Sequence, residues 1–284
     1  MSAADAFLGA VPEATRRLPA SRWEDGSLCE GSELVAEEVP VALAYNGITH
    51  AVMLASPLDL EDFALGFTLS ERIVRQRGDV YDIEVEEGAC GQAGGIVVSL
   101  RIAAGAMARL KGARAARTGK TGCGLCGVES LAYFEREACL PAAPAACGAR
   151  IDPAALHRAM AAMAGRQQLH HATGAVHAAA WADPQGDLVC VREDVGRHNA
   201  LDKLVGALAL AGGAAPPGFA VVTSRASFEM VQKAARAGFG MLAAISAPTA
   251  LAVRMAEEAG LTLAGFVRGG RHVVYSHPQR LLVA

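Results

Sequence analysis

The carboxyl-terminal part of the chain alternates short apolar runs with helix-forming stretches, and this alternation restricts the fold more than any other feature. Strands are predicted at residues 219–222, 241–245 and 262–267, and helices at residues 227–237 and 249–259. Regular alternation of this kind is typical of a layered α/β sheet. The sequence therefore predicts a βαβαβ unit.

Further elements precede this unit. A helix is predicted at residues 153–163, and strands are predicted at residues 176–181 and 188–192, joined by the turn-forming run Asp183-Pro184-Gln185-Gly186-Asp187. The proline- and alanine-rich stretch around residues 141–144 indicates a linker. We therefore expect a carboxyl-terminal α/β domain over residues 149–284.

The amino-terminal part begins with a predicted hairpin and a predicted helix. Asn46-Gly47 separates apolar runs at residues 39–43 and 49–54, and this dipeptide favours a tight type I′ turn between two strands. Ser56 and Pro57 then supply helix-start signals. The helical spacing of the apolar residues that follow predicts a helix that ends near Arg75.

The remaining elements complete a two-domain α/β prediction. Ile83 and Val85 alternate with acids, and residues 95–102 are rich in β-forming side chains, so two more strands are expected. Residues 26–148 then make a smaller α+β domain. Residues 1–25 contain Arg16-Arg17 but no continuous apolar stretch for export, and we expect them to form a disordered tail.

Composition and charge restrict the classes of partner. The 284 residues carry a net charge of -3, which provides no basic field for nucleic acid. The most apolar stretch, residues 207–222, is interrupted by glycines and prolines, so we expect no membrane segment. The seven cysteines are scattered and odd in number, which excludes a disulfide scaffold and favours a reducing cytoplasm.

Polar loops follow the predicted parallel strands, at residues 223–227, 246–249 and 265–271. Ligands of open α/β sheets bind at this edge, next to helix amino termini whose free amides attract anions. In Arg268-Gly269-Gly270-Arg271 the glycines permit close approach and the guanidinium groups can hold phosphate. One hypothesis is that a phosphate-bearing ligand binds there. The alternative is a plain hairpin turn with solvated arginines.

Two cysteines lie within a run of glycines, Thr121-Gly122-Cys123-Gly124-Leu125-Cys126-Gly127. Glycine on both sides of each thiol leaves the backbone free to adopt many conformations, which suits a segment that another molecule approaches closely. Three kinds of chemistry use such a pair: half of a zinc site, dithiol redox exchange, and nucleophilic sulfur carriage through a persulfide.

The surroundings of the pair weigh against zinc and against thioredoxin-like redox chemistry. The nearest further thiols, Cys139 and Cys147, are too widely spaced for the second half of a zinc ribbon. The glycine neighbours differ from the aromatic and proline residues of thioredoxin-like pairs. A helix before the pair would carry a basic face that favours thiolate at Cys123, or would simply be a solvated charged helix. That face consists of Lys111, Arg114, Arg117 and Lys120.

From Glu37 to its end the chain resembles the FdhD/NarQ family, sulfur carrier proteins needed to mature formate dehydrogenase. The longest matching stretches are residues 192–203 and 224–234. The shorter motifs are Ser56-Pro57-Leu58-Asp59-Leu60, Ala64-Leu65-Gly66-Phe67, Gly122-Cys123-Gly124-Leu125-Cys126-Gly127 and Thr173-Gly174-Ala175-Val176-His177-Ala178-Ala179. Together these motifs are highly specific.

The resemblance implies a sulfurtransferase that carries sulfur as a persulfide on Cys123, with Cys126 as an accessory thiol. The implied donor is a cysteine desulfurase. The implied acceptor is the molybdenum cofactor in its bis(molybdopterin guanine dinucleotide) form, bound before insertion into the formate dehydrogenase apoenzyme; no permanent cofactor is implied. The resemblance implies that the residues that bind the cofactor are Phe266, Val267, Arg268, Gly269, Gly270 and Arg271. The family also implies a homodimer.

A second function remains open beside this one. The chain would then be a non-catalytic escort chaperone that binds the cofactor, with a cysteine pair that holds a metal or is structural. Mass spectrometry for a sulfur adduct on Cys123 distinguishes the two functions.

The resemblance also implies a cytidine deaminase-like fold for the carboxyl-terminal domain. Zinc deaminases require the motifs H-x-E and P-C-x-x-C. Here Ala178 and Ala179 follow His177, and glycine precedes Cys123, so we expect no metal site. The polar run at residues 192–199 is either a site wall or a buried network that caps the following helix. His177 is expected to be a packed strand histidine.

Overall fold

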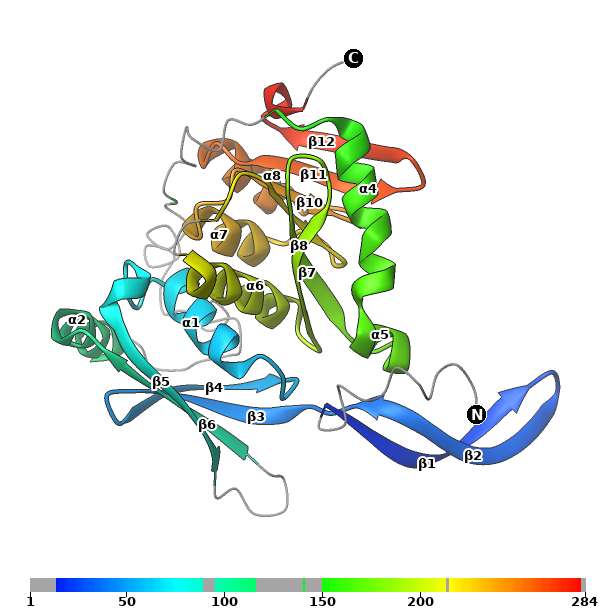
Figure 1. Cartoon of the computed structure of the whole chain (residues 1–284), viewed down its shortest axis with the longest axis horizontal. Helices are drawn as coiled ribbons and strands as arrows, with labels where there is room; N and C mark the ends of the chain where they lie inside the picture. Colours follow the sequence, from blue (N-terminus) through cyan, green and yellow to red (C-terminus); the bar gives the residue numbers. More distant parts are fainter. Residues whose placement is uncertain (1–13, 89–94, 116–139, 141–149, 213–214, 282–284) are drawn as a thin grey trace.

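A six-stranded sheet forms the centre of the protein (Figure 1). The computed structural model describes residues 14–88, 95–115, 140, 150–212 and 215–281. The strand order is β12-β11-β10-β9-β7-β8. The strands are β7 (His177–Ala182), β8 (Leu188–Asp194), β9 (Phe219–Val222), β10 (Met241–Ala244), β11 (Thr262–Arg268) and β12 (Arg271–Ser276).

The predicted βαβαβ unit is confirmed at the middle of this sheet. Strand β10 pairs in parallel with both β9 and β11. The crossover helices are α7 (Phe228–Arg236) and α8 (Ala250–Glu258). Strands β7 and β8 form the antiparallel pair expected around the turn at Asp183, and β12 closes the other edge.

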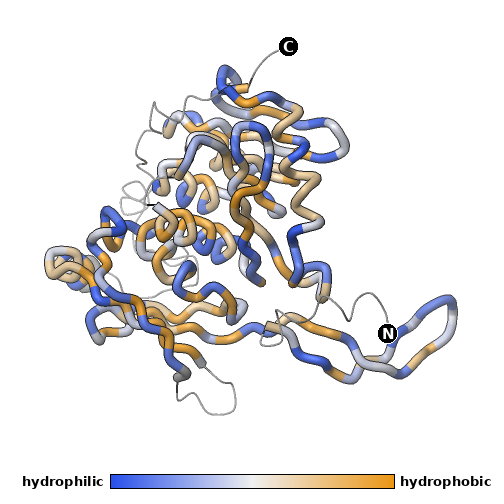
Figure 2. Tube along the Cα trace, in the orientation of Figure 1, coloured by the Kyte–Doolittle hydropathy of each residue, from blue (hydrophilic) through white to orange (hydrophobic). Residues whose placement is uncertain are grey.

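Helices cover both faces of the sheet, because successive side chains of its strands point to opposite sides. Ala179, Trp181 and Val222 pack in one core with α7, α8 and α6 (Arg197–Gly212). Ala180 and Val221 pack in the other core with α4 (Pro153–Met163), a helix that matches its predicted bounds. Figure 2 shows that α6 and the central strands are largely apolar.

A second, four-stranded sheet has the order β4-β3-β6-β5. Its strands are β3 (Val39–Tyr45), β4 (Ile48–Ala55), β5 (Val80–Gly88) and β6 (Gly95–Ile102). The predicted type I′ turn is confirmed, since Asn46 and Gly47 have φ values of 49° and 80°. Helix α1 (Leu60–Ser70) packs against this sheet, and α2 (Ala104–Ala115) follows β6.

Helices α1 and α6 join the two sheets at very close range (Figure 1). A Cβ atom on Gly66 of α1 would lie 1.7 Å from the backbone oxygen of Asp202, and one on Gly206 of α6 would lie 1.9 Å from the backbone oxygen of Asp62. Only glycine permits this contact. The two parts of the chain therefore share one helical layer, although their sheets fall on either side of the expected boundary near residue 149.

Residues 14–25, the described part of the expected disordered tail, are ordered instead. Strands β1 (Thr15–Glu24) and β2 (Ser27–Ala36) form an antiparallel arm that extends from the body (Figure 1). Asp25-Gly26 makes the turn, with φ values of 48° and 83°. This Asp-Gly pair is a strong hairpin signal in the sequence. The base of the arm packs through Ala14 and Ala36.

Helix α1 is shorter than predicted and begins later. Asp59, with φ 51°, precedes the first helical residue, and the helix ends at Ser70 because Arg72 adopts a left-handed conformation with φ 56°. The hydroxyl of Ser56 does not cap this helix. It accepts a hydrogen bond of 3.1 Å from the backbone N–H of Val195.

The remaining short elements are η2 (Arg77–Asp79), η5 (Ala164–Arg166), α5 (Gln168–Thr173) and η6 (Pro278–Arg280). Within the described ranges, no helix combines the length and apolar character needed to cross a membrane.

Candidate functional site

Three helices begin at one edge of the six-stranded sheet. The parallel strands β9, β10 and β11 all end there, and α7 and α8 start directly after β9 and β10. Strand β8 ends at the same edge, because Asp194 pairs with His177 at the start of the antiparallel strand β7, and α6 follows. Free backbone N–H groups at helix starts attract anions. The edge is therefore suited to a phosphate-bearing ligand.

Basic side chains from three elements accompany these helix starts. Arg197 and His198 open α6, His177 opens β7, and Arg225 lies in the loop before α7. Burial is the main cause that lowers the pKa of His177, and the charge of Arg197 lowers it further. The imidazole of His177 is thus mainly uncharged near neutral pH. The positive charge at this edge comes from arginines such as Arg197 and Arg225.

Glu229 lies in the first turn of α7 within this basic surrounding. Its Oε2 atom is 3.6 Å from Nε2 of His198 and accepts a hydrogen bond of 2.8 Å from the hydroxyl of Ser227. His198 is the main cause that lowers the pKa of Glu229 to about 2, and Ser227 contributes. Glu229 is therefore a carboxylate at neutral pH, and it lies at ion-pair distance from His198.

The predicted cofactor-binding run, residues 266–271, forms the hairpin between β11 and β12. Gly269 and Gly270 make its turn, with φ values of 56° and 73°, and Arg268 and Arg271 are exposed, as in the plain-hairpin alternative. Val267 is fully buried in the core around α4. The hairpin geometry is compatible with ligand binding, since both arginines remain accessible.

Phe266 has a backbone conformation that the sequence did not predict. Its φ of 54° lies in the left-handed region, which bulky residues rarely adopt and which is often held at functional sites. Its N–H donates a hydrogen bond of 3.2 Å to the backbone oxygen of Ser246, in the loop after β10. The Arg268 guanidinium lies 6.0 Å from the centroid of the Phe266 ring. The hairpin is thus fixed to a second loop of the same edge.

The polar run at residues 192–199 contains a buried network. Asp194 and Lys203 form an ion pair of 2.7 Å in which both side chains have no exposure. Asp194 also accepts hydrogen bonds from the N–H of Gly196 at 2.8 Å and from the amide of Asn199 at 2.9 Å. Lys203 donates to the backbone oxygen of Ser56 at 3.1 Å. For Asp194 and Asn199, the structure therefore supports the buried-network interpretation.

A second network was missed by sequence reasoning. Lys233 of α7 donates to Asp202 of α6 at 2.9 Å, to Glu71 at 2.8 Å and to the hydroxyl of Ser70 at 3.0 Å. Ser70 in turn donates to Asp202 at 2.6 Å. The only sequence signal was the presence of charged residues on otherwise buried helix faces. These contacts join the end of α1 to α6 and to the last turn of α7.

The predicted sulfur-carrying residues, Cys123 and Cys126, lie outside the described residues. So do Arg117 and Lys120 of the proposed basic face, whereas Lys111 is exposed on α2. Among the residues that the structure describes, no cluster of three or more His, Cys, Asp or Glu side chains could hold a metal ion. Cys29 and Cys190 are free thiols, and burial raises the pKa of Cys190.

Comparisons with known proteins identify the relatives of this chain. The model of the FdhD/NarQ family matches residues 36–282. The curated protein "Sulfur carrier protein FdhD" of Cupriavidus necator is 56% identical over 272 residues, which cover 96% of this chain and 92% of that protein. The protein of the same name from Xanthomonas euvesicatoria is 53% identical over 264 residues, covering 92% of this chain and 90% of that protein.

The fold is also found in a solved structure. A crystal structure of a candidate formate dehydrogenase accessory protein from Desulfotalea psychrophila aligns with a TM-score of 0.73 and 24% sequence identity, covering 95% of this chain and 100% of that one. The architecture is therefore shared even where the sequences have diverged. Because the family model spans most of the chain and curated relatives match it at more than half of the aligned positions, the chain belongs to the FdhD/NarQ family.

Proposed function

We propose that this protein is a cytoplasmic sulfurtransferase that moves sulfur from a cysteine desulfurase, through a persulfide on Cys123, to the molybdenum cofactor before the cofactor enters formate dehydrogenase. The observation that carries the proposal is the family membership, with relatives named as sulfur carrier proteins at 56% identity. The glycine-flanked thiol at Cys123 supplies a nucleophile suited to that role.

Loading of Cys123 requires no external oxidant. The Cys123 thiolate attacks the outer sulfur of the persulfide on the donor enzyme, so one S–S bond forms as another breaks. The donor cysteine leaves as a thiolate. Both sides of the exchange hold one persulfide and one thiolate, and no net oxidation takes place.

Cys126 supplies a route for release. Its thiolate attacks the inner sulfur of the Cys123 persulfide, which forms a disulfide between Cys123 and Cys126 and expels the outer sulfur with its electron pair as hydrosulfide. In this step the Cys126 thiolate is oxidised to the disulfide level, the carried sulfur is reduced to the sulfide level, and the inner sulfur of Cys123 keeps its oxidation level. A cellular dithiol reductant then returns the pair to its starting state.

The acceptor binds at the carboxyl edge of the six-stranded sheet. This proposal is supported by the three helix starts, by the exposed Arg268 and Arg271, and by the left-handed Phe266 that fixes their hairpin. The guanine dinucleotide form of the cofactor carries phosphates that these groups can hold. We also propose, from the family resemblance, a homodimer and a cytidine deaminase-like carboxyl-terminal domain without zinc chemistry.

Mass spectrometry tests sulfur carriage directly. The purified protein is incubated with a cysteine desulfurase and cysteine, and peptides are mapped without reduction. We expect a peptide containing Cys123 to gain one sulfur atom, and we expect Cys126→Ala to retain this adduct while Cys123→Ala loses it. Tightly bound zinc without any adduct would instead establish the alternative, an escort chaperone that binds the cofactor but carries no sulfur.

A further inference from the structure

The four-stranded sheet has one face that is packed and one that is open. Val41, Leu43 and Val98 point into the core that also contains Phe63 of α1 and Met107 of α2. Figure 1 shows α1 between this sheet and the six-stranded one. Successive residues of a strand point to opposite sides, so the residues that alternate with the core residues lie on the opposite face. We call it the outer face, and its central residues are Ala42, Val52, Leu54, Glu84, Glu86 and Val97.

Strand pairing places apolar and acidic side chains in one row across the outer face. Val52 of β4 pairs with Ala42 of β3, which also pairs with Val97 of β6. Val97 in turn pairs with Glu86 of β5. Residues that pair in this way have their side chains on the same face of the sheet. The row is therefore apolar over three strands and acidic at the fourth.

Large apolar side chains are exposed at the β4 end of the outer face. Val52 is 60% exposed, and Leu54, the next residue of β4 on the same face, is 56% exposed. Isolated exposed apolar residues are common, whereas neighbouring ones beside a polar rim are typical of an interaction site. Val97 is partly buried in the same row. The β4 end is therefore suited to apolar contact with a partner.

The β5 end of the outer face carries negative charge. Glu84 and Glu86 are both exposed, and neither has an ion-pair partner among the residues that the structure describes. Asp82, on the same strand, lies 3.9 Å from Arg101. The two glutamates are thus available to cationic groups of a partner.

We propose that the outer face binds a basic amphipathic helix of a partner protein. Neighbouring strands are about 4.8 Å apart, so β4 and β5 are about 14 Å apart, and a helix with its side chains is about 10–12 Å wide. A helix that lies over β3 and β6 therefore contacts Val52 and Leu54 with its apolar side. Lysines or arginines at its flank reach Glu84 and Glu86. Ala42 beneath the helix is small enough to permit close approach, and the proposal does not depend on sulfur carriage.

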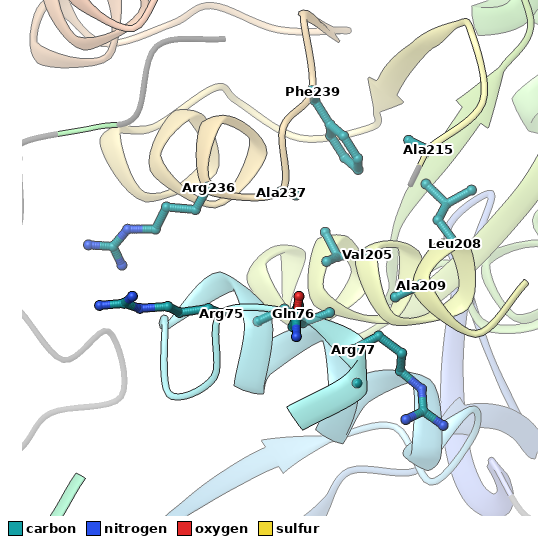
Figure 3. Close-up of a pocket in the computed structure, with 12 residues that line it drawn as sticks. Arg75, Gln76, Arg77, Val205, Leu208, Ala209, Ala215, Arg236, Ala237 and Phe239 are labelled. Carbon is teal, nitrogen blue, oxygen red and sulfur yellow. The ribbon is translucent and has the colours of Figure 1, made fainter. Parts of the chain in front are cut away.

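Charge distinguishes the outer face from an apolar pocket elsewhere in the protein. A pocket of about 520 Å³ lies between α6 and the segment after α1 (Figure 3). Its lining includes Phe239, but also Arg75 and Arg77, and none of the lining residues that the structure describes is acidic. Like charges disfavour association, so a basic helix is not attracted to this pocket.

The probe for the outer face is a synthetic helical peptide of about 18 residues, with leucine along one side and lysine along the other. A matched peptide has glutamate in place of each lysine. In isothermal titration calorimetry we expect saturable binding of one lysine peptide per chain, and binding of the glutamate peptide that is at least about tenfold weaker. Equal binding of both peptides, or no saturable binding of the lysine peptide, would overturn the proposal.

One substitution tests the apolar contact. Leu54→Ser should weaken binding of the lysine peptide about tenfold, the equivalent of about 1.4 kcal/mol, because it removes an apolar side chain from the interface. Val189→Ser is the matched control, since Val189 lies on β8 and is also 56% exposed. It should leave binding unchanged. Unchanged binding by Leu54→Ser, or an equal loss in the control, would contradict the assignment of the outer face.

A second substitution tests the charge. Glu84→Gln should weaken binding about threefold at about 0.05 M salt, and the effect should disappear at about 0.5 M salt, where exposed charges are screened. Glu258→Gln, at an exposed acid on α8, is the control and should have no effect. An equal effect of both substitutions would show that only the net charge of the protein attracts the peptide, and would overturn the proposal.

Two further measurements complete the test. Thermal unfolding shows whether the variants are folded, and because Leu54 and Glu84 are exposed we expect both variants to unfold at the temperature of the wild type. Analytical ultracentrifugation compares the oligomeric state of Leu54→Ser with that of the wild type, and we expect no difference. Conversion of a wild-type dimer to a monomer by Leu54→Ser would assign the outer face to a second copy of the chain instead, and would overturn the proposal.

Discussion

Lys203 and Asp194 form a fully buried ion pair, with Nζ 2.7 Å from Oδ2. Lys203 also bonds to the backbone oxygens of Ser56 and Glu193, and Asp194 bonds to the backbone N–H groups of Ser56 and Gly196. The pair therefore holds the β4–α1 connection against the start of α6. Helix α6 is one of the three helices that begin at the candidate site.

Removal of one partner leaves the other as an uncompensated buried charge. We expect Lys203→Met to lower the free energy of unfolding by about 3–5 kcal/mol, measured by urea denaturation. Lys111→Met, at an exposed lysine on α2, is the matched control and should change it by less than about 0.5 kcal/mol. A loss of similar size in both variants would show that the pair has no special role.

The contact between α1 and α6 should not tolerate a methyl group. Gly206→Ala places a Cβ atom 1.9 Å from a backbone oxygen, and we expect a loss of about 1–3 kcal/mol in the free energy of unfolding. Gly112→Ala is the control, because no atom lies within 4 Å of its added methyl group, and helix propensity predicts a gain of up to about 1 kcal/mol. Stabilisation of both variants would mean that the helices can separate without cost.

The contact between His157 and His272 should contribute a loss of protein stability as the pH decreases from about 7.5 to 5.5. The Nδ1 atom of His272 lies 3.0 Å from Nε2 of His157, and burial, followed by the charge of His157, lowers the pKa of His272 below its ordinary 6.5. The unfolded chain then binds the proton more tightly than the folded one. The contribution of His272 is complete above about pH 6.5 and is lost as the pH falls toward the folded-state pKa.

His272→Gln should reduce this pH dependence, as measured by urea unfolding at both pH values. Part of it should remain, because the pKa of His177 is lowered as well. An unchanged slope in the variant would rule out the His157–His272 contact as a source.

Guanine nucleotide binding should depend on the hairpin arginines. We expect Arg268→Ala and Arg271→Ala each to weaken the binding of guanosine diphosphate about tenfold or more, because each removes a charge-assisted hydrogen bond to phosphate. Isothermal titration calorimetry measures the effect, with Arg101→Ala as the control on β6. Undiminished affinity in both hairpin variants would mean that the hairpin is a plain turn.

The two cysteines should differ in importance. Cys123→Ala should abolish activation of formate dehydrogenase in a reconstituted assay, whereas Cys126→Ala should retain part of it, because another thiol can complete the release. Both variants should unfold at the wild-type temperature. Full activation by Cys123→Ala would refute the assignment of this residue as the carrier.

The sequence predicted those helices, strands and turns that are specified by residues close together in the chain. The alternation after residue 219 predicted β9 to β11 with α7 and α8, and Asn46-Gly47 predicted its hairpin. Asp25-Gly26 carries the same kind of signal, and the β1–β2 arm could have been predicted from it. The end of α1 was not predictable, because the left-handed turn at Arg72 has no glycine to mark it.

By itself, the sequence determined the class of the fold, the family, and the run of residues from Phe266 to Arg271 as a candidate ligand site, because each of these is encoded in contiguous residues. Only the tertiary structure decided that Lys203 and Lys233 would be buried with Asp194 and Asp202, and that Gly66 and Gly206 would lie at the contact between two helices. Such contacts join residues far apart along the chain, and their free energy exists only once packing has removed water from between them.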